Sequence, residues 1–181
     1  MLSVLRIWLA QWRHPRYLLA GVMHIFLFAG FLILGARSTQ LVFVGFVEGF
    51  ELPGFSGSLG TFYNVLKDYA ATWVLIAVAI AAVRRVLFKP ARYAVPPQYG
   101  RDHTWEALLV LGLIATLVIS ESLFEASLVV AQIQKGSHTE IVAPLTLMWF
   151  FRHLVIDASP ATLQGLHSFS YFVHDITFFF F

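Results

Sequence analysis

The chain has 181 residues, of which 59% are hydrophobic and 12% are charged, and its mean hydropathy is +0.76. Soluble domains are about 45–50% apolar and about 25% charged, so this composition excludes an ordinary soluble domain. The sequence contains no cysteine, which excludes disulfides, iron–sulfur ligation and thiolate zinc sites within this chain. The formal net charge of +2 is too small to indicate a nucleic-acid partner. Several apolar runs of about 20 residues instead predict an integral membrane protein.

The N-terminal segment precedes the first predicted span. Within residues 1–15, Trp8 and Trp12 lie in a short apolar stretch, and no small-residue cleavage site follows it. This pattern favours an interfacial amphipathic helix over a signal peptide. We expect the first membrane span to run from Tyr17 to Ala36, where Arg37 closes it.

Three further spans are predicted along the chain. The second runs from Phe62 to about Val83, and Lys67 and Asp68 near its start are interpreted as interface anchors. The third runs from Thr104 to Gln132. The last begins near Ala161 and is still apolar at Phe181. Because a span normally ends in an interface anchor, we expect the natural protein to continue beyond this point.

The segment between the last two spans is apolar only in its middle. Within residues 138–158, Pro144, Arg152 and His153 leave a clean apolar run of about ten residues, which is too short to cross a membrane. We therefore expect an interfacial or re-entrant helix there. The predicted fold is an all-α membrane bundle with about four transmembrane helices, an interfacial N-terminal helix and an outer-side helix. These elements form one transmembrane domain over residues 1–181.

The basic residues predict the orientation of the chain. Eight of the twelve lysines and arginines precede the first span or lie between the second and third spans. Basic residues concentrate on the cytoplasmic side, so we expect both segments, and with them the N-terminus, to be cytoplasmic in a cell inner membrane. Residues 38–60 and 133–160 then face outward. The eight residues are Arg6, Arg13, Arg16, Arg84, Arg85, Lys89, Arg92 and Arg101.

Only three of the seven histidines lie inside predicted spans, namely His24, His167 and His174. Ionisable residues inside a membrane are costly and usually face the bundle interior. A neutral imidazole is the usual axial ligand of buried haem iron. Ligation by two histidines requires two imidazoles at one depth on facing helices.

The positions of His24 and His174 predict equal depth. His24 lies about 10 Å from the inner end of its span, and so roughly 20 Å from the outer face, at about 1.5 Å per residue. His174 lies roughly 20 Å into the last span from the outer side. We therefore predict that His24 and His174 bind b-type haem, whereas hydrogen bonding between helices is the alternative. His167 is one heptad before His174 and cannot share its haem, and His153 is a candidate for a second outer site. The remaining histidines are interpreted as interfacial residues: His14, His103 and His138.

Four stretches, in this order, carry a resemblance to a known family: MHIFLFAGFLIL, FYNVLKDYAATWVLIAVAIAAVRRVLFKPAR, EALLVLGLIATLVISESLFEA and LHSFSYFVHDITFFFF. They resemble the membrane domain of (Fe–S)-binding oxidoreductases related to heterodisulfide reductase. That domain is similar in turn to the haem-b gamma subunit of respiratory nitrate reductase. The resemblance covers residues 10–181. Its most specific features are the early histidine of the first span, the RR-hydrophobic-P exit of the second and the LH-x6-H pattern of the last.

The resemblance implies haem b at His24 and His174, with one or two haems in the chain. It also implies menaquinone or ubiquinone as the exchangeable substrate. The iron–sulfur partner would be a separate subunit or a C-terminal domain beyond this sequence. The chain departs from the nitrate reductase subunit at Leu34, where that subunit has a second histidine. The family also has a histidine about one helix length after the position of His174. An alternative therefore stays open, in which His24 pairs with that residue and His174 or His167 binds a second haem.

Glu121 and Glu125 lie four residues apart, on one face of the third span near its outer end. Two carboxylates at this depth are candidates to take protons from quinol, and they are the predicted catalytic residues. The alternative is a polar interfacial end of a long helix.

The function expected from these patterns is a membrane-bound b-type cytochrome subunit or domain. It would pass electrons between the quinone pool and an iron–sulfur redox partner, as part of a quinone-linked oxidoreductase in a respiratory chain. The alternatives are a non-redox structural subunit of a membrane respiratory complex and a small transporter. The sequence shows no inverted repeat and no span broken by glycine and proline, which counts against a transporter.

Overall fold

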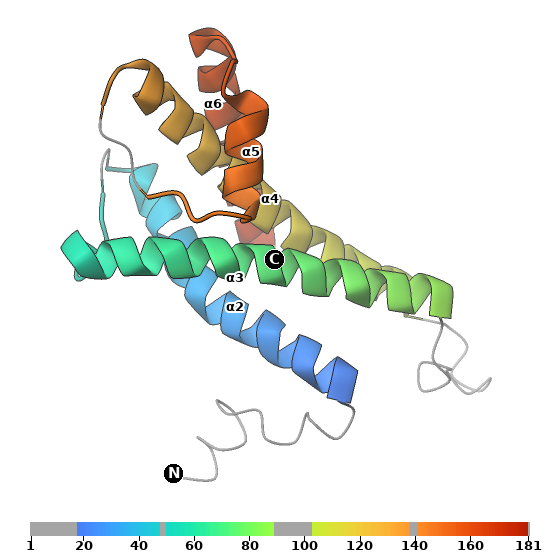
Figure 1. The fold of residues 1–181 in the computed structure, drawn as a ribbon. Coiled ribbons are helices and arrows are strands. Elements are labelled where there is room, and N and C mark those ends of the chain that lie inside the picture. Colours follow the sequence, from blue (N-terminus) through green and yellow to red (C-terminus); the bar gives the residue numbers. More distant parts are fainter. Residues whose placement is uncertain (1–17, 48–49, 89–102, 138–140, 181) are drawn as a thin grey trace, which may run out of the picture.

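A computed structural model describes residues 18–47, 50–88, 103–137 and 141–180. The predicted N-terminal interfacial helix lies outside these residues, as does most of the basic loop after the second span. Within the described residues every regular element is helical, which confirms the predicted all-α class (Figure 1). The elements are α2 (Leu18–Val44), α3 (Gly57–Val83), the π-helical turn η3 (Arg84–Phe88), α4 (Thr104–Gln134), α5 (Leu147–Val155) and α6 (Pro160–Phe180).

Three stretches of helix are both long enough and apolar enough to cross a membrane. They are Gly21–Val44, Gly57–Phe88 and Thr104–Gln134. The predicted fourth span, α6, has 21 residues, a length of about 31 Å that matches the membrane core of about 30 Å. It is more polar than the other three and is not among these candidate spans. The chain is therefore a multi-pass membrane protein, and exposed apolar side chains such as Phe31 and Trp73 contact lipid.

Helix α2 extends further than the first predicted span. It continues eight residues past the expected end at Ala36, to Val44. Arg37 therefore lies inside the helix and does not close it. The extension is possible because Arg37 finds carboxylate partners within the bundle, at 2.8 Å from Glu125. A charge that is paired inside the protein does not need to reach an aqueous surface.

Helix α4 lies at the centre of the bundle and contacts α3, α5 and α6. Helix α6 runs antiparallel to it, since His167 approaches the Phe124 carbonyl and His174 approaches the Leu117 carbonyl. The short helix α5 confirms a non-spanning helix within residues 138–158. It is joined to α3 by a hydrogen bond of 2.9 Å from the Leu147 amide to the hydroxyl of Thr72.

An apolar core joins α2, α3 and α4. Its buried members are Leu34, Ala71, Val74, Val78 and Val118. On α3 the buried positions follow spacings of three and four residues, which places them on one stripe of the helix. Helices α2 and α3 approach closely at Gly30, where an added Cβ would overlap a methyl group of Val74. Close approach of this kind fixes where the two helices cross.

Candidate functional site

Five charged side chains from three helices meet inside the bundle, and we refer to them as the charge cluster. Arg37 comes from α2, Lys67 and Asp68 from α3, and Glu121 and Glu125 from α4. The Lys67 ammonium donates to both carboxylate oxygens of Glu125, and the Arg37 guanidinium lies 2.8 Å from the same carboxylate. Lys67 also lies 3.6 Å from Asp68 Oδ1, and Arg37 Nε lies 3.8 Å from Glu121 Oε1.

The charge cluster corrects the predicted role of three residues. Lys67 and Asp68 were expected as interface anchors and Arg37 as the end of a span, yet the side chains of Lys67 and Asp68 are only 3% and 6% exposed. The signal that could have identified them was present, because charges within an apolar run are functional candidates by default. Their spacing from the nearest loops made an interfacial position equally compatible with the sequence.

Glu121 and Glu125 share one face of α4, as predicted, but their surroundings differ. Glu125 is bound by two cations at hydrogen-bonding distance, Arg37 and Lys67. Glu121 has Arg37 as its ion-pair partner at 3.8 Å, and its Oε1 atom is buried without a hydrogen-bond partner among the described residues. The two carboxylates are therefore not equivalent. The polar interfacial helix end, offered as the alternative for this pair, does not describe two buried and ion-paired groups.

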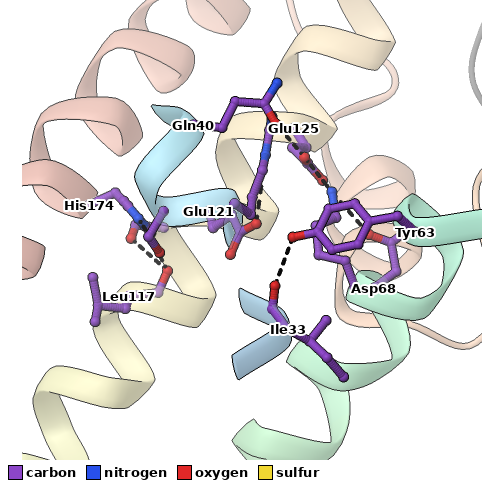
Figure 2. A network of polar contacts seen from close by, with 12 residues as sticks. Ile33, Gln40, Tyr63, Asp68, Leu117, Glu121, Glu125 and His174 are labelled. Atoms are coloured by element: carbon purple, nitrogen blue, oxygen red, sulfur yellow. Dashed lines mark hydrogen bonds and ion pairs between the residues drawn. The ribbon is translucent and has the colours of Figure 1, made fainter. Parts of the chain in front are cut away.

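An apolar cavity of about 300 Å³ lies beside the charge cluster, between α2, α3, α4 and α6. Its polar lining consists of Ser38, Glu121 and His174. Figure 2 shows Glu121 between His174 on one side and Glu125 on the other, so this carboxyl group faces both the cavity and the charge cluster. The remaining lining residues are Leu27, Phe31, Leu34, Gly35, Val74, Ile114, Leu117, Val118 and Phe178.

The His174 imidazole is held in one tautomer by its two partners. Its Nδ1 atom lies 3.1 Å from the Leu117 carbonyl, and its Nε2 atom lies 3.1 Å from the hydroxyl of Ser38. A carbonyl oxygen only accepts, so Nδ1 carries the proton and Nε2 accepts from Ser38. His174 is 1% exposed, and its ring lines the cavity. A fixed Nδ1–H with a lone pair on Nε2 is the arrangement in which histidine binds a metal.

The structure does not bring together His24 and His174, the two residues predicted to share a haem. His24 is exposed on α2 and lies fourteen residues before Ser38, about 21 Å along the helix, whereas Ser38 contacts His174. The expected equal depth fails because α2 extends beyond its predicted end. His174 is level with Ser38, which lies beyond the predicted end of the span and fourteen residues after His24. The positions of His24 and His174 do not support a shared haem, and haem binding itself stays a prediction.

His167 lies in a different place again. It is half-buried, its Nδ1 is 3.4 Å from the Phe124 carbonyl, and its ring stacks on that of Phe124 with centroids 4.1 Å apart. It lines a second cavity of about 640 Å³ near the ends of α4 and α6, together with Gln134 and Lys135. The candidate His153 is exposed and contacts Trp149 on its own helix.

The described residues fit a haem only in part. His174 has the tautomer and the burial that an axial ligand needs, but its Nε2 already accepts from Ser38. None of the other histidines that the structure describes lies across the cavity from it, so the opposite ligand would have to come from outside these residues. The cavity would also have to widen to accept a porphyrin ring. No group of three or more histidine, aspartate or glutamate side chains in the described part of the chain is arranged to hold a metal ion.

Comparisons with known proteins identified no relative of this chain. A scan against protein-family models, a search of curated proteins and a search of solved structures each found no match.

Proposed function

We propose that this chain is a membrane subunit or domain of a quinone-linked electron-transfer system. In this role it passes electrons between the quinone pool, menaquinone or ubiquinone, and an iron–sulfur partner. The observation that carries the proposal is the apolar cavity within the bundle, whose polar lining is a hydroxyl, an imidazole and a carboxyl group. Ligand sites are mostly apolar clefts of about 300–1,000 Å³ with a few placed polar groups.

His174 is the residue of this chain to which we assign haem b. Its Nδ1–H is donated to the Leu117 carbonyl, so Nε2 would be the ligand atom, and it would exchange its hydrogen bond from Ser38 for the haem iron. The haem would supply one-electron transfer. The packed apolar side chains around it would exclude water, and the charge cluster would hold compensating charges nearby. The iron–sulfur partner is what the resemblance of the sequence implies, and because the chain has no cysteine, its cluster would be held outside these residues.

A reduced-minus-oxidised absorbance spectrum of the purified full chain tests this assignment. We expect a b-type band in the parent protein, its loss in His174→Ala and its retention in His153→Ala, which removes an exposed histidine outside the cavity. His24→Ala distinguishes the alternatives, because it should leave the His174 component intact unless the two residues share a haem. No band in the parent protein supplied with haem, or an unchanged band in His174→Ala, would overturn the proposal.

The charge cluster favours one alternative function, a small ion-coupled transporter. Charged residues buried between membrane helices mark ion and proton pathways as well as redox sites. The same reduced-minus-oxidised spectrum distinguishes the two functions, because a transporter without haem gives no b-type absorbance band. A non-redox structural subunit would also give no such band. It would not need an apolar cavity that is lined by the polar residues Ser38, Glu121 and His174.

For the orientation, we propose that the N-terminus and residues 84–103 face the cytoplasm, in a cell inner membrane. The excess of basic residues in these two segments supports this. The chain has no native cysteine, so single cysteines at Ser56 and Gln98 can be labelled without background. An impermeant thiol reagent should reach Ser56→Cys only from outside and Gln98→Cys only from inside. Labelling of both from one side would refute this topology.

A further inference from the structure

The second cavity, of about 640 Å³, lies between the end of α4 and the start of α6 and has no part in the proposed function. Two contacts between these segments bound it. At the outer end the Gln134 side-chain amide donates to the Ala158 carbonyl at 3.0 Å, and at the inner end His167 Nδ1 lies 3.4 Å from the Phe124 carbonyl. Phe124 and Gln134 are ten residues apart on α4, so the cavity extends along about 15 Å of helix. Its volume falls within the range of about 300–1,000 Å³ that is usual for ligand sites.

The lining of this cavity changes in chemistry along α4. Leu128, Ala131 and Lys135 follow spacings of three and four residues, so they share the stripe of the helix that faces the cavity. The first two are apolar, whereas Lys135 is the first residue after the candidate span Thr104–Gln134. The Lys135 ammonium therefore lies at the level where the apolar core of the membrane ends and the lipid headgroups begin.

Lys135 is a cation without an anionic partner in the described part of the chain. It is exposed, and none of the salt bridges between described residues includes it. Asp157, in the turn after α5, is also exposed and does not line the cavity. An unpaired ammonium at the rim of a cavity favours a negatively charged ligand, and lysine is a common phosphate-binding residue.

A second polar group lies deeper in the cavity. Gln164 on α6 lines it, and its side-chain amide makes no hydrogen bond to any of the residues that the structure describes. The antiparallel pairing of α4 and α6 places Gln164 level with Ser127, about two helical turns closer to the membrane centre than Lys135. Its NH2 group can donate to a carbonyl oxygen. In a phospholipid the ester carbonyls also lie closer to the membrane centre than the phosphate, so the order of polar groups is the same.

We propose that this cavity binds an anionic phospholipid, with the phosphate at Lys135 and the glycerol ester groups at Gln164. The apolar side chains of Leu128, Ala131 and Leu163 contact the first part of an acyl chain. The inference goes beyond the proposed function, because lipid binding at this place needs neither haem nor an iron–sulfur partner.

The binding experiment uses the full chain, freed of lipid in detergent, and dioleoyl phosphatidylglycerol as the probe. Native mass spectrometry measures the bound lipid. We expect Lys135→Gln to weaken binding by about tenfold or more, since it removes the charged donor to the phosphate. Equal binding by Lys135→Gln and the parent protein would overturn the proposal.

Arg152→Gln is the matched control. Lys135 and Arg152 are the two basic residues of the chain outside both the charge cluster and the segments proposed to be cytoplasmic, and Arg152 does not line the cavity. Arg152→Gln should therefore bind the lipid as the parent protein does. A loss as large as that in Lys135→Gln would mean that any basic residue on this side attracts the lipid, which would refute a site at the cavity.

Two further ligands distinguish a phospholipid from a free phosphate ester. Dioleoylglycerol has the same acyl chains without the phosphate and should bind at least about tenfold more weakly than phosphatidylglycerol. Glycerol phosphate has the phosphate without the chains and should not displace the lipid at equal concentration. Equal binding of dioleoylglycerol would refute recognition of the phosphate, and displacement by glycerol phosphate would refute a lipid ligand.

A larger side chain at Gln164 tests the cavity itself. Gln164→Trp should occupy part of the cavity and weaken lipid binding, whereas Ser168→Trp should not, because Ser168 is an exposed residue of the same helix that does not line the cavity. Both positions are exposed, so both variants should fold. Equal affinity in the two variants would overturn the cavity as the binding site.

Thermal unfolding separates a binding role of Lys135 from a structural one. In detergent without phospholipid, Lys135→Gln and the parent protein should unfold at the same temperature, since Lys135 has no ion-pair partner among the described residues. Added phosphatidylglycerol should raise the unfolding temperature of the parent protein more than that of the variant, because a ligand of the folded state stabilises it by mass action. Equal shifts in the two proteins would contradict the proposal.

Discussion

Removal of the Lys67 ammonium should strongly destabilise the bundle. Lys67 is 3% exposed, donates to both carboxylate oxygens of Glu125, and lies 3.6 Å from Asp68. In Lys67→Met, the three acids of the charge cluster keep only one of its two described cations, Arg37. Breaking a buried ion pair by removing one partner typically costs about 3–5 kcal/mol, because the other charge is left uncompensated. We therefore expect the free energy of unfolding to fall by about this amount.

The measurement is reversible unfolding of the purified protein in mixed micelles, followed by circular dichroism. Lys135→Met is the matched control, since it removes an exposed lysine at the end of α4 and should change stability by less than about 0.5 kcal/mol. The double variant Lys67→Met with Glu125→Leu removes both charges of the pair and should recover part of the loss, which a double-mutant cycle quantifies. A loss below about 1 kcal/mol in Lys67→Met would show that the pair is hydrated and not buried.

Two further predictions concern packing and capping. Gly30→Ala should lower the free energy of unfolding by about 1–3 kcal/mol, because the new methyl group overlaps Val74, whereas Gly112→Ala should not destabilise the protein. The same unfolding assay checks both, and an unchanged midpoint in Gly30→Ala would mean that α2 and α3 do not meet there. Thr146→Ala should cost about 1 kcal/mol, because the threonine hydroxyl caps α5 by accepting from the Trp149 amide at 3.2 Å. A Thr146→Ser variant, which keeps the hydroxyl, should retain most of that stability, and equal losses in the two variants would contradict the capping role.

The sequence predicted the helices because each contains an apolar run, long in the predicted spans and about ten residues in the segment that forms α5. It also placed Glu121 and Glu125 on one face of α4, since residues four apart on a helix are neighbours. Each helix, and the shared face of Glu121 and Glu125, depends only on the residues of one segment, so the local sequence pattern is enough to predict it.

The partners of the charged residues could not be predicted in the same way. Arg37, Lys67 and Glu125 come from three helices, and nothing in any one segment says that they meet. The equal depth of His24 and His174 was predicted wrongly for a related reason. Depth depends on where each span begins and ends, and the paired Arg37 allows α2 to continue into residues expected to form a loop.

Arg37 and Ser38 are adjacent on α2, yet they contact different partners. Arg37 reaches Glu125 and Ser38 reaches His174, so consecutive residues of one rigid helix connect α4 with α6. Each residue turns an α-helix by about 100° and advances it by about 1.5 Å. Insertion of a single residue between the two would rotate one contact away from the other, although every side chain would still be present. The spacing along α2 is therefore itself part of the site. A deletion or insertion between Arg37 and Ser38 should break either the contact with Glu125 or the contact with His174, whereas a conservative substitution elsewhere on α2 should keep both.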